Sequence, residues 1–182
     1  MAVLSEEGRR LADAVMARYP ERRSALLPLL YLVQAEQGLV TRDGMQEVAE
    51  LLGLTTAEVE AVATYYTMFK KSPAGDWVLS VCTNLSCALV GGRHLYERAR
   101  ALVDDDEGIS VEEVECLGAC DAAPVGQVNY CNYDRLTEER LDELIERLRN
   151  GDPPEPSRGP KPVPHRRTAR LLAGIREEAA GG

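Results

Sequence analysis

The feature that most constrains this chain of 182 residues is a set of four cysteines in two close pairs. Cys82 and Cys87 are spaced C-x4-C, and Cys116 and Cys120 are spaced C-x3-C, with 28 residues between the two pairs. Thiolate sulfurs are soft ligands that select zinc, copper(I) or iron–sulfur clusters. A fold that brings the two pairs together therefore creates a metal centre.

The spacings favour a 2Fe–2S cluster, which is bound by four cysteine sulfurs, and leave two alternatives open. Structural zinc sites mostly use C-x2-C turns, because one tetrahedral ion takes two sulfurs from a very tight turn. A thioredoxin-type thiol redox site uses C-x-x-C, and this sequence contains none. From proximity in the sequence, we expect Cys82 and Cys87 to bind one iron, and Cys116 and Cys120 to bind the other. The N–H groups of Leu89, Val90 and their neighbours, and those of residues 117–119, are candidate hydrogen-bond donors to the sulfurs.

The remaining cysteine and the histidines do not extend this ligand set. Cys131 lies between turn-forming asparagines, and we interpret it as a structural thiol. His94 and His165 do not form a ligand-spaced pair, which argues against a Rieske-type centre. The sequence shows no nucleophile–base pair, no phosphate-binding glycine loop and no dinucleotide motif. We therefore expect the chain to have no catalytic residues and to pass electrons without binding an organic substrate.

Each cysteine pair follows a predicted strand. Residues 77–81 form a short β-rich apolar run that ends directly at Cys82, and residues 109–115 form a second run that ends at Cys116. A strand–helix–strand unit favours a parallel pair of strands with a right-handed crossover. Because parallel strands end at the same edge of a sheet, this topology brings together two pairs that are distant in the sequence.

The elements around these strands complete a predicted α/β sandwich. We expect a helix over residues 86–103 to connect the two strands, and two short strands within residues 125–133 to form a hairpin. Thr137 is placed to cap a last amphipathic helix. Gly91 and Gly92 favour either close approach of the backbone near the first cysteine pair or simple helix packing.

A helical bundle is predicted to precede this domain. Within residues 1–70, four apolar-patterned segments each follow a residue that can cap a helix: Ser5, Ser24, Thr41 and Thr55. The fourth helix is expected to reach about Phe69. A turn-rich stretch over residues 70–76 then separates the bundle from the domain of residues 76–150. No polar cluster in the bundle resembles a catalytic site, so we interpret it as a scaffold with a docking surface.

Residues 151–182 differ in composition from the rest of the chain. Six of the ten prolines lie between residues 153 and 164, which predicts an extended linker. The tail carries a net charge of +2, whereas residues 1–150 carry −11. Residues 166–180 have the pattern of a short amphipathic helix, which is either disordered in the free chain or ordered against a partner.

Composition excludes several classes of protein. The net charge of −9 argues against nucleic acid as a partner, because phosphate contacts need clustered Lys and Arg. No apolar run approaches the length of a membrane span, and the N-terminus lacks the layout of a signal peptide. We therefore expect the chain to lie in the cytoplasm, where thiols stay reduced.

The cysteine pairs and their surroundings resemble the small 2Fe–2S subunit of respiratory complex I, NADH:quinone oxidoreductase. The residues that carry the resemblance are Cys82-x4-Cys87, Cys116-Leu-Gly-Ala-Cys120, Ala123-Pro-Val, Val128-Asn129, Gly38-Leu-Val and Val62-Ala-Thr-Tyr-Tyr-Thr-Met-Phe69. The match extends over about residues 20–150 and does not include the tail.

This resemblance implies a thioredoxin-like 2Fe–2S domain preceded by a helical bundle, with one cluster bound by Cys82, Cys87, Cys116 and Cys120. It implies a flavin subunit as partner, which binds NADH and FMN, together with the large iron–sulfur subunit of the same complex. The cluster would then accept one electron near the FMN, at the inner face of the cell membrane. Alternatives are the equivalent subunit of an NAD-linked formate dehydrogenase or hydrogenase, a free-standing ferredoxin and, in another class, a zinc-stabilised interaction adaptor.

Overall fold

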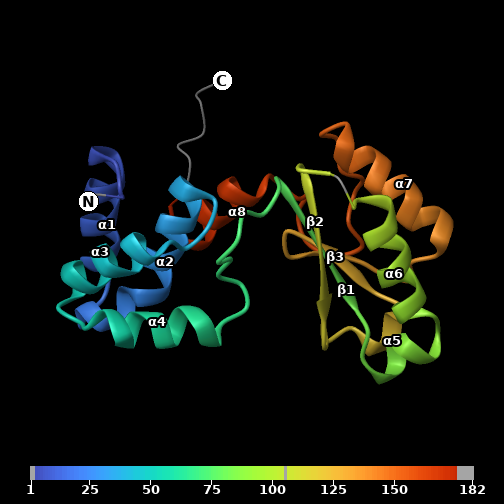
Figure 1. Ribbon diagram of the computed structural model, residues 1–182, viewed down its shortest axis with the longest axis horizontal. Helices are drawn as coiled ribbons and strands as arrows, with labels where there is room; N and C mark the ends of the chain where they lie inside the picture. The colour runs from blue at the N-terminus through green and yellow to red at the C-terminus, as the bar shows by residue number, and fades with distance from the viewer. Residues whose placement is uncertain (1–2, 105, 176–182) are drawn as a thin grey trace. The chain divides into compact units, whose positions relative to one another are not determined.

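A computed structural model describes residues 3–104 and 106–175, which fall into two compact units (Figure 1). Of the described residues, 3–73 and 166–175 form the first unit, and 74–104 with 106–165 form the second. The chain thus passes from the first unit to the second and returns to the first near its end. In the described part of the chain, no helix has the length and apolar character needed to cross a membrane.

Helices build the first unit, and the sequence explains where they begin. Its elements before Pro73 are α1 (Glu6–Met16), a 3-10 turn (Arg22–Ala25), α2 (Leu26–Gln37), α3 (Arg42–Leu52) and α4 (Thr56–Tyr65). The predicted caps Ser5, Thr41 and Thr55 each accept a hydrogen bond from a backbone N–H in the first turn of a helix. The predicted helical bundle is confirmed.

Two helix ends differ from the prediction. α2 begins at Leu26 after the 3-10 turn and has no side-chain cap, so Ser24 does not cap it. α4 ends well before Phe69, because Tyr66 has an extended backbone. The chain then buries Phe69 against Tyr31, with ring centroids 5.0 Å apart. Burying a phenylalanine side chain stabilises the fold by about 2 kcal/mol. This exceeds the free energy that the helix propensities of one further turn would contribute.

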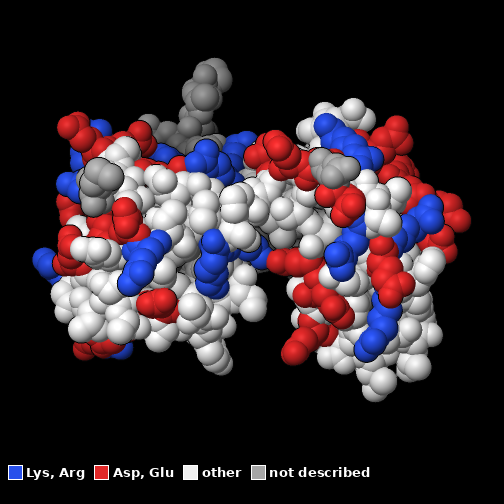
Figure 2. All heavy atoms as spheres, viewed as in Figure 1, with Lys and Arg blue, Asp and Glu red and all other residues white. Residues whose placement is uncertain are grey.

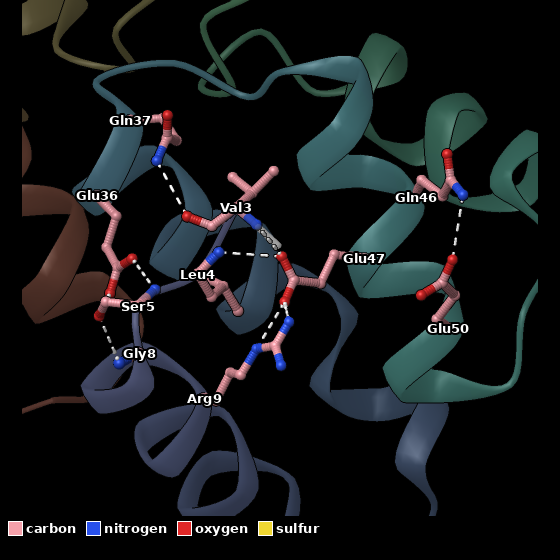
Figure 3. A network of polar contacts seen from close by, with 10 residues as sticks. All are labelled: Val3, Leu4, Ser5, Gly8, Arg9, Glu36, Gln37, Gln46, Glu47 and Glu50. Carbon is pink, nitrogen blue, oxygen red and sulfur yellow. Dashed lines mark hydrogen bonds and ion pairs between the residues drawn. The ribbon is translucent and has the colours of Figure 1, made fainter. Parts of the chain in front are cut away.

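A buried carboxylate joins the start of the chain to the bundle (Figure 3). Glu47 on α3 accepts hydrogen bonds from the backbone N–H groups of Val3 and Leu4, at 2.6 and 2.9 Å. The guanidinium of Arg9 on α1 donates to the other oxygen of Glu47 at 2.8 Å. Burial alone raises the pKa of this carboxyl, but these hydrogen bonds together outweigh burial and hold the pKa below its usual value.

The described residues of the second unit are built on a four-stranded sheet. Its strands are β1 (Trp77–Cys82), β2 (Ile109–Val114), β3 (Gly126–Val128) and β4 (Cys131–Tyr133), in the order β2-β1-β3-β4. β1 and β2 are parallel, whereas β3 pairs antiparallel with both β1 and β4. The predicted parallel pair and the short hairpin are both confirmed.

Two helices, α6 (Gly92–Leu102) and α7 (Glu138–Arg149), lie side by side on one face of this sheet (Figure 1). Their apolar side chains form one core with those of the strands. Arg98 on α6 donates to Asp142 on α7 at 2.7 Å, and Thr137 caps α7 as predicted. The second unit is therefore the predicted two-layer α/β sandwich.

The helix predicted over residues 86–103 is instead two helices, α5 (Leu85–Leu89) and α6. Gly91 separates them with a φ of 93°, in the left-handed region that glycine adopts without strain. Gly92, the first residue of α6, lies against the backbone of Cys82 and Cys87.

The segment after α7 differs from the extended linker that its composition predicts, because it packs within the second unit as far as His165. The Tyr133 hydroxyl donates to the Pro154 carbonyl at 2.8 Å, and Asn129 donates from Nδ2 to the Val163 carbonyl at 2.8 Å. Prolines lack an N–H but keep a carbonyl acceptor. The Pro-rich segment lacks the N–H groups for a continuous ladder of strand hydrogen bonds, so side chains of the β3–β4 hairpin donate to its carbonyl groups instead.

The last described helix, α8 (His165–Leu172), returns the chain to the first unit. Three apolar side chains in and after it are buried in the core of that unit: Ala169, Ala173 and Ile175. The predicted amphipathic helix of residues 166–180 is thus shorter and is ordered against the chain's own bundle. Residues 176–180 of that prediction lie outside the described residues.

Candidate metal centre

The parallel strands deliver both cysteine pairs to one edge of the sheet. Cys82 is the last residue of β1 and stands in register with Val114, the last residue of β2. The Thr83 N–H donates to the Val114 carbonyl at 3.1 Å, and the Cys82 thiol donates to the Glu115 carbonyl at 3.7 Å. Cys116 follows immediately, so the loops that carry the two pairs begin side by side.

The first pair lies beneath the surface. Cys82 and Cys87 are 4% and 3% exposed, and Cys87 is held on α5. Burial, a hydrogen bond with Cys82 and the nearby Cys120 thiol raise the pKa of the Cys87 thiol to about 11. The Val125 N–H opposes this shift by donating to the Cys87 sulfur. Reactive redox cysteines have lowered pKa values, so the raised pKa argues against a thiol redox role for Cys87.

The second pair is open to solvent. Cys116 and Cys120 are both exposed, and Cys120 begins a short 3-10 turn, Cys120–Ala122. The Gly118 N–H donates to the Cys116 sulfur at 3.2 Å, which confirms one of the donors predicted within residues 117–119. Gly118 has a φ of 68°, so its left-handed backbone is what requires glycine there. The loop thus turns its own backbone N–H onto a candidate ligand.

Gly92 lies against the backbone of the first pair. A Cβ at this position would stand 2.6 Å from the Cys82 carbonyl oxygen and 2.8 Å from the Cys87 carbonyl oxygen. Only glycine permits this approach without moving the loop. Of the two alternatives that the sequence leaves for the Gly91–Gly92 pair, the structure therefore supports close approach to the cysteine loop.

The chemistry of the donor set fits a 2Fe–2S cluster. Such a cluster distributes four cysteine ligands over two irons, and all four cysteines are free thiols. They come in one buried and one exposed pair, and the Gly118 N–H donates to the sulfur of Cys116.

The other residues considered from the sequence lie outside this arrangement. Cys131 is buried in β4, and burial raises the pKa of its thiol, which agrees with its interpretation as a structural thiol. His94 on α6 lies 3.1 Å from Glu138 on α7. His165 begins α8 and is buried. The sequence did not identify the Val125 N–H as a hydrogen-bond donor to the Cys87 sulfur, because every residue except proline has a backbone N–H and its direction depends on the fold.

An exposed apolar surface adjoins the first pair. Leu85, Leu89 and Val90, on and just after α5, are 71%, 78% and 54% exposed. Val90 also lines an open cleft of about 480 Å³, together with residues of α6, the start of α7 and the loop around Pro124. In Figure 2 the tip of the second unit where α5 lies is largely uncharged, whereas acidic and basic side chains are interspersed over the rest of that face.

The fold and the cysteine pairs define a class of protein, a small α/β domain that holds an iron–sulfur cluster. The family model of the thioredoxin-like [2Fe-2S] ferredoxins matches residues 12–149, and the chain belongs to this family. Its cofactor is therefore one 2Fe–2S cluster.

Two relatives within this class are named as subunits of one kind of enzyme complex. A protein of Mycobacterium bovis that is named as a subunit of NADH-quinone oxidoreductase is 41% identical over 174 residues, which cover 92% of this chain and 69% of that protein. NADH-quinone oxidoreductase subunit 2 of Thermus thermophilus is 39% identical over 149 residues, which cover 76% of this chain and 82% of that protein. By their names, both relatives are subunits of an oxidoreductase complex.

A solved structure shares the fold. The NAD+-reducing [NiFe]-hydrogenase in its H2-reduced state matches with a TM-score of 0.61 at 22% identity. The match covers 70% of this chain and 22% of the hydrogenase chain.

Proposed function

We propose that this chain is the small electron-transfer subunit in the NADH dehydrogenase module of an NADH:quinone oxidoreductase, respiratory complex I. The observation that carries the proposal is the meeting of both cysteine pairs at one edge of the sheet, in a member of a 2Fe–2S family. Relatives at 41% and 39% identity, both named as subunits of NADH-quinone oxidoreductase, support the choice of complex.

The proposed ligands are the four cysteines of the two pairs: Cys82, Cys87, Cys116 and Cys120. We assign the first pair to one iron and the second pair to the other. A bound 2Fe–2S cluster supplies one-electron redox chemistry. The N–H groups of Val125 and Gly118 donate toward the sulfurs of Cys87 and Cys116, where they stabilise the negative charge that reduction adds.

We assign the exposed apolar residues around α5 to the interface with a flavin subunit, which binds NADH and FMN. Leu85, Leu89 and Val90 flank Cys87, and apolar side chains of this kind form the buried cores of interfaces. A partner bound there lies close to the cluster, as electron transfer from the flavin requires. This sequence contains no nucleotide-binding motif, which supports a role as a non-catalytic subunit. The large iron–sulfur subunit is the further proposed partner, and the complex holds this chain at the inner face of the cell membrane.

Electron paramagnetic resonance of the anaerobically purified full chain, before and after dithionite, tests this function. A signal that appears only on reduction is expected, with two irons per chain and no zinc. Alanine at any of Cys82, Cys87, Cys116 or Cys120 should abolish the signal, because alanine offers iron no ligand atom. Cys131→Ala is the matched control and should keep the signal.

Two results would overturn the proposal. A colourless protein with one zinc per chain would identify an interaction adaptor instead. A signal that survives Cys82→Ala or disappears in Cys131→Ala would show that the ligand set is wrong.

A further inference from the structure

The C-terminal segment runs along the edge strand of the sheet. Arg158 forms an antiparallel bridge with Asn132 of β4, and the adjacent Ser157 N–H donates to the Asn132 carbonyl at 2.7 Å. The Ser157 hydroxyl in turn accepts a hydrogen bond from the Asp134 N–H at 2.9 Å. These contacts fix the backbone from which the Arg158 side chain extends.

The guanidinium of Arg158 reaches two carboxylates. Its Nε donates to Asp134 at 2.9 Å, and a second nitrogen lies 3.5 Å from an oxygen of Asp121. Asp121 directly follows Cys120, within the same 3-10 turn. A positive charge from the tail therefore stands beside the loop of a proposed cluster ligand.

Backbone hydrogen bonds connect the same region to the Cys120 loop. The Arg135 N–H donates to the Ala122 carbonyl, and the Leu136 N–H donates to the Pro124 carbonyl, both at 2.9 Å. Arg135 has a φ of 48°, which residues other than glycine rarely adopt, so its surroundings must hold it there. The pairing of Arg158 with Asp134 restrains the residue immediately before this turn.

We propose that Arg158 is a positioning residue for the 2Fe–2S cluster, which holds the Cys120 loop and raises the reduction potential of the cluster. This inference rests on the proposed function, because it requires a redox-active cluster on the four cysteines. Four thiolates make the cluster anionic, and reduction adds a further negative charge. A cation nearby stabilises the reduced state more than the oxidised state, and the carboxylate of Asp121 has the opposite effect.

A redox titration of the full chain, followed by electron paramagnetic resonance, tests the inference. At a fixed potential, Arg158→Gln should lower the ratio of reduced to oxidised cluster about threefold. A change of this size is typical of the interaction between two solvent-exposed charges, here the guanidinium and the cluster. This change equals a fall of about 30 mV in midpoint potential, since a tenfold change is 59 mV for one electron. Arg158→Lys should keep the wild-type midpoint, and Asp121→Asn should raise it. Lys161→Gln, on the same segment but paired with Asp152, is the matched control and should leave the midpoint unchanged.

The direction of each shift separates this role from a purely structural one. Loss of structure lowers the iron content in every variant, whereas a charge effect moves Arg158→Gln and Asp121→Asn in opposite directions. An unshifted midpoint in Arg158→Gln, or an equal shift in Lys161→Gln, overturns the inference and leaves the proposed function standing. A wild-type chain without a reducible signal refutes the proposed function, and this inference with it. If Arg158→Gln loses its iron while Arg158→Lys keeps it, the positioning role is supported, and Asp121→Asn then decides the charge effect.

Discussion

Gly92→Ala is expected to damage the cluster site, although alanine is ordinarily the better helix former. The added Cβ would lie 2.6 Å from the Cys82 carbonyl oxygen, and ordinary contact begins near 3.4 Å, so that carbonyl would have to retreat by about 0.8 Å. The Cys87 carbonyl oxygen at 2.8 Å adds a second collision. Both neighbours are backbone atoms of proposed ligands, which cannot swing aside as the end of a long side chain does.

Two opposing contributions determine the free energy of unfolding of this variant. Replacing glycine by alanine in a helix gains at most about 1 kcal/mol. Overpacking against fixed neighbours costs about 1–3 kcal/mol. Because the Cβ would meet two backbone oxygens, we take the upper part of this range, about 2–3 kcal/mol, and expect a net loss of about 1–2 kcal/mol in the second unit. The iron content should also fall, because the loop of Cys82 and Cys87 is displaced.

The assay can report on the second unit alone, because the chain has one tryptophan, Trp77, and it lies in β1. Urea unfolding followed by its fluorescence, together with iron per chain and visible circular dichroism, gives both expected effects. Gly44→Ala is the matched control, since a Cβ there would lie 2.5 Å from a side-chain atom of Val33, in the first unit. The control should keep its iron and its Trp77 transition. Full iron occupancy and an unchanged transition in Gly92→Ala would refute the reasoning.

Two further substitutions test a hydrogen-bond network in the first unit and the attachment of the Pro-rich segment within the second unit. Glu47→Gln should destabilise the first unit by about 1–3 kcal/mol at neutral pH, because the amide cannot replace a carboxylate that accepts two backbone hydrogen bonds and pairs with Arg9. The pKa of Glu47 is lowered in the folded chain, so its contribution to the free energy of unfolding is complete above the ordinary pKa of about 4.3 and is lost as pH falls through the folded value. Acid unfolding followed by far-UV circular dichroism should therefore lack this pH-dependent contribution in Glu47→Gln. An acid-unfolding profile equal to that of the wild type would contradict the prediction. Tyr133→Phe should cost about 1 kcal/mol, because the Pro154 carbonyl loses its 2.8 Å donor. Limited proteolysis should then cut the Pro-rich segment faster with the iron content unchanged, whereas equal cleavage rates would show that this hydrogen bond does not hold the segment.

The features of the site that could be predicted from the sequence are those with a local signal or a topological rule behind them. Short apolar runs that end at Cys82 and near Cys116 identify the strands, and the preference of strand–helix–strand units for parallel pairing places their ends together. Caps such as Thr55 and Thr137 depend on one side chain and the next turn, so they too are visible in the sequence.

The features that could not be predicted depend on contacts between distant segments. Residues 86–103 have the pattern of one helix, and the break at Gly91 follows from the packing of Gly92 against carbonyl groups earlier in the chain. The prolines of the tail predict an unpacked linker, because composition does not reveal that Tyr133 and Asn129 bind its carbonyl groups. Tertiary contacts of this kind override local preference at both places.

The tail has contacts with both units of the chain, and this limits how its role can be tested. Its first part contributes Arg158 to the Cys120 loop, and its last part contributes Ala169 to the core of the helical bundle. A truncation before residue 152 would remove the charge beside the cluster and uncover that core at the same time, so a loss of activity would have two causes. Arg158→Gln removes the charge and the guanidinium contacts with Asp121 and Asp134, but leaves the buried face of α8 in place. A shifted midpoint potential with an unchanged unfolding profile of the first unit would therefore assign the redox effect to the guanidinium itself.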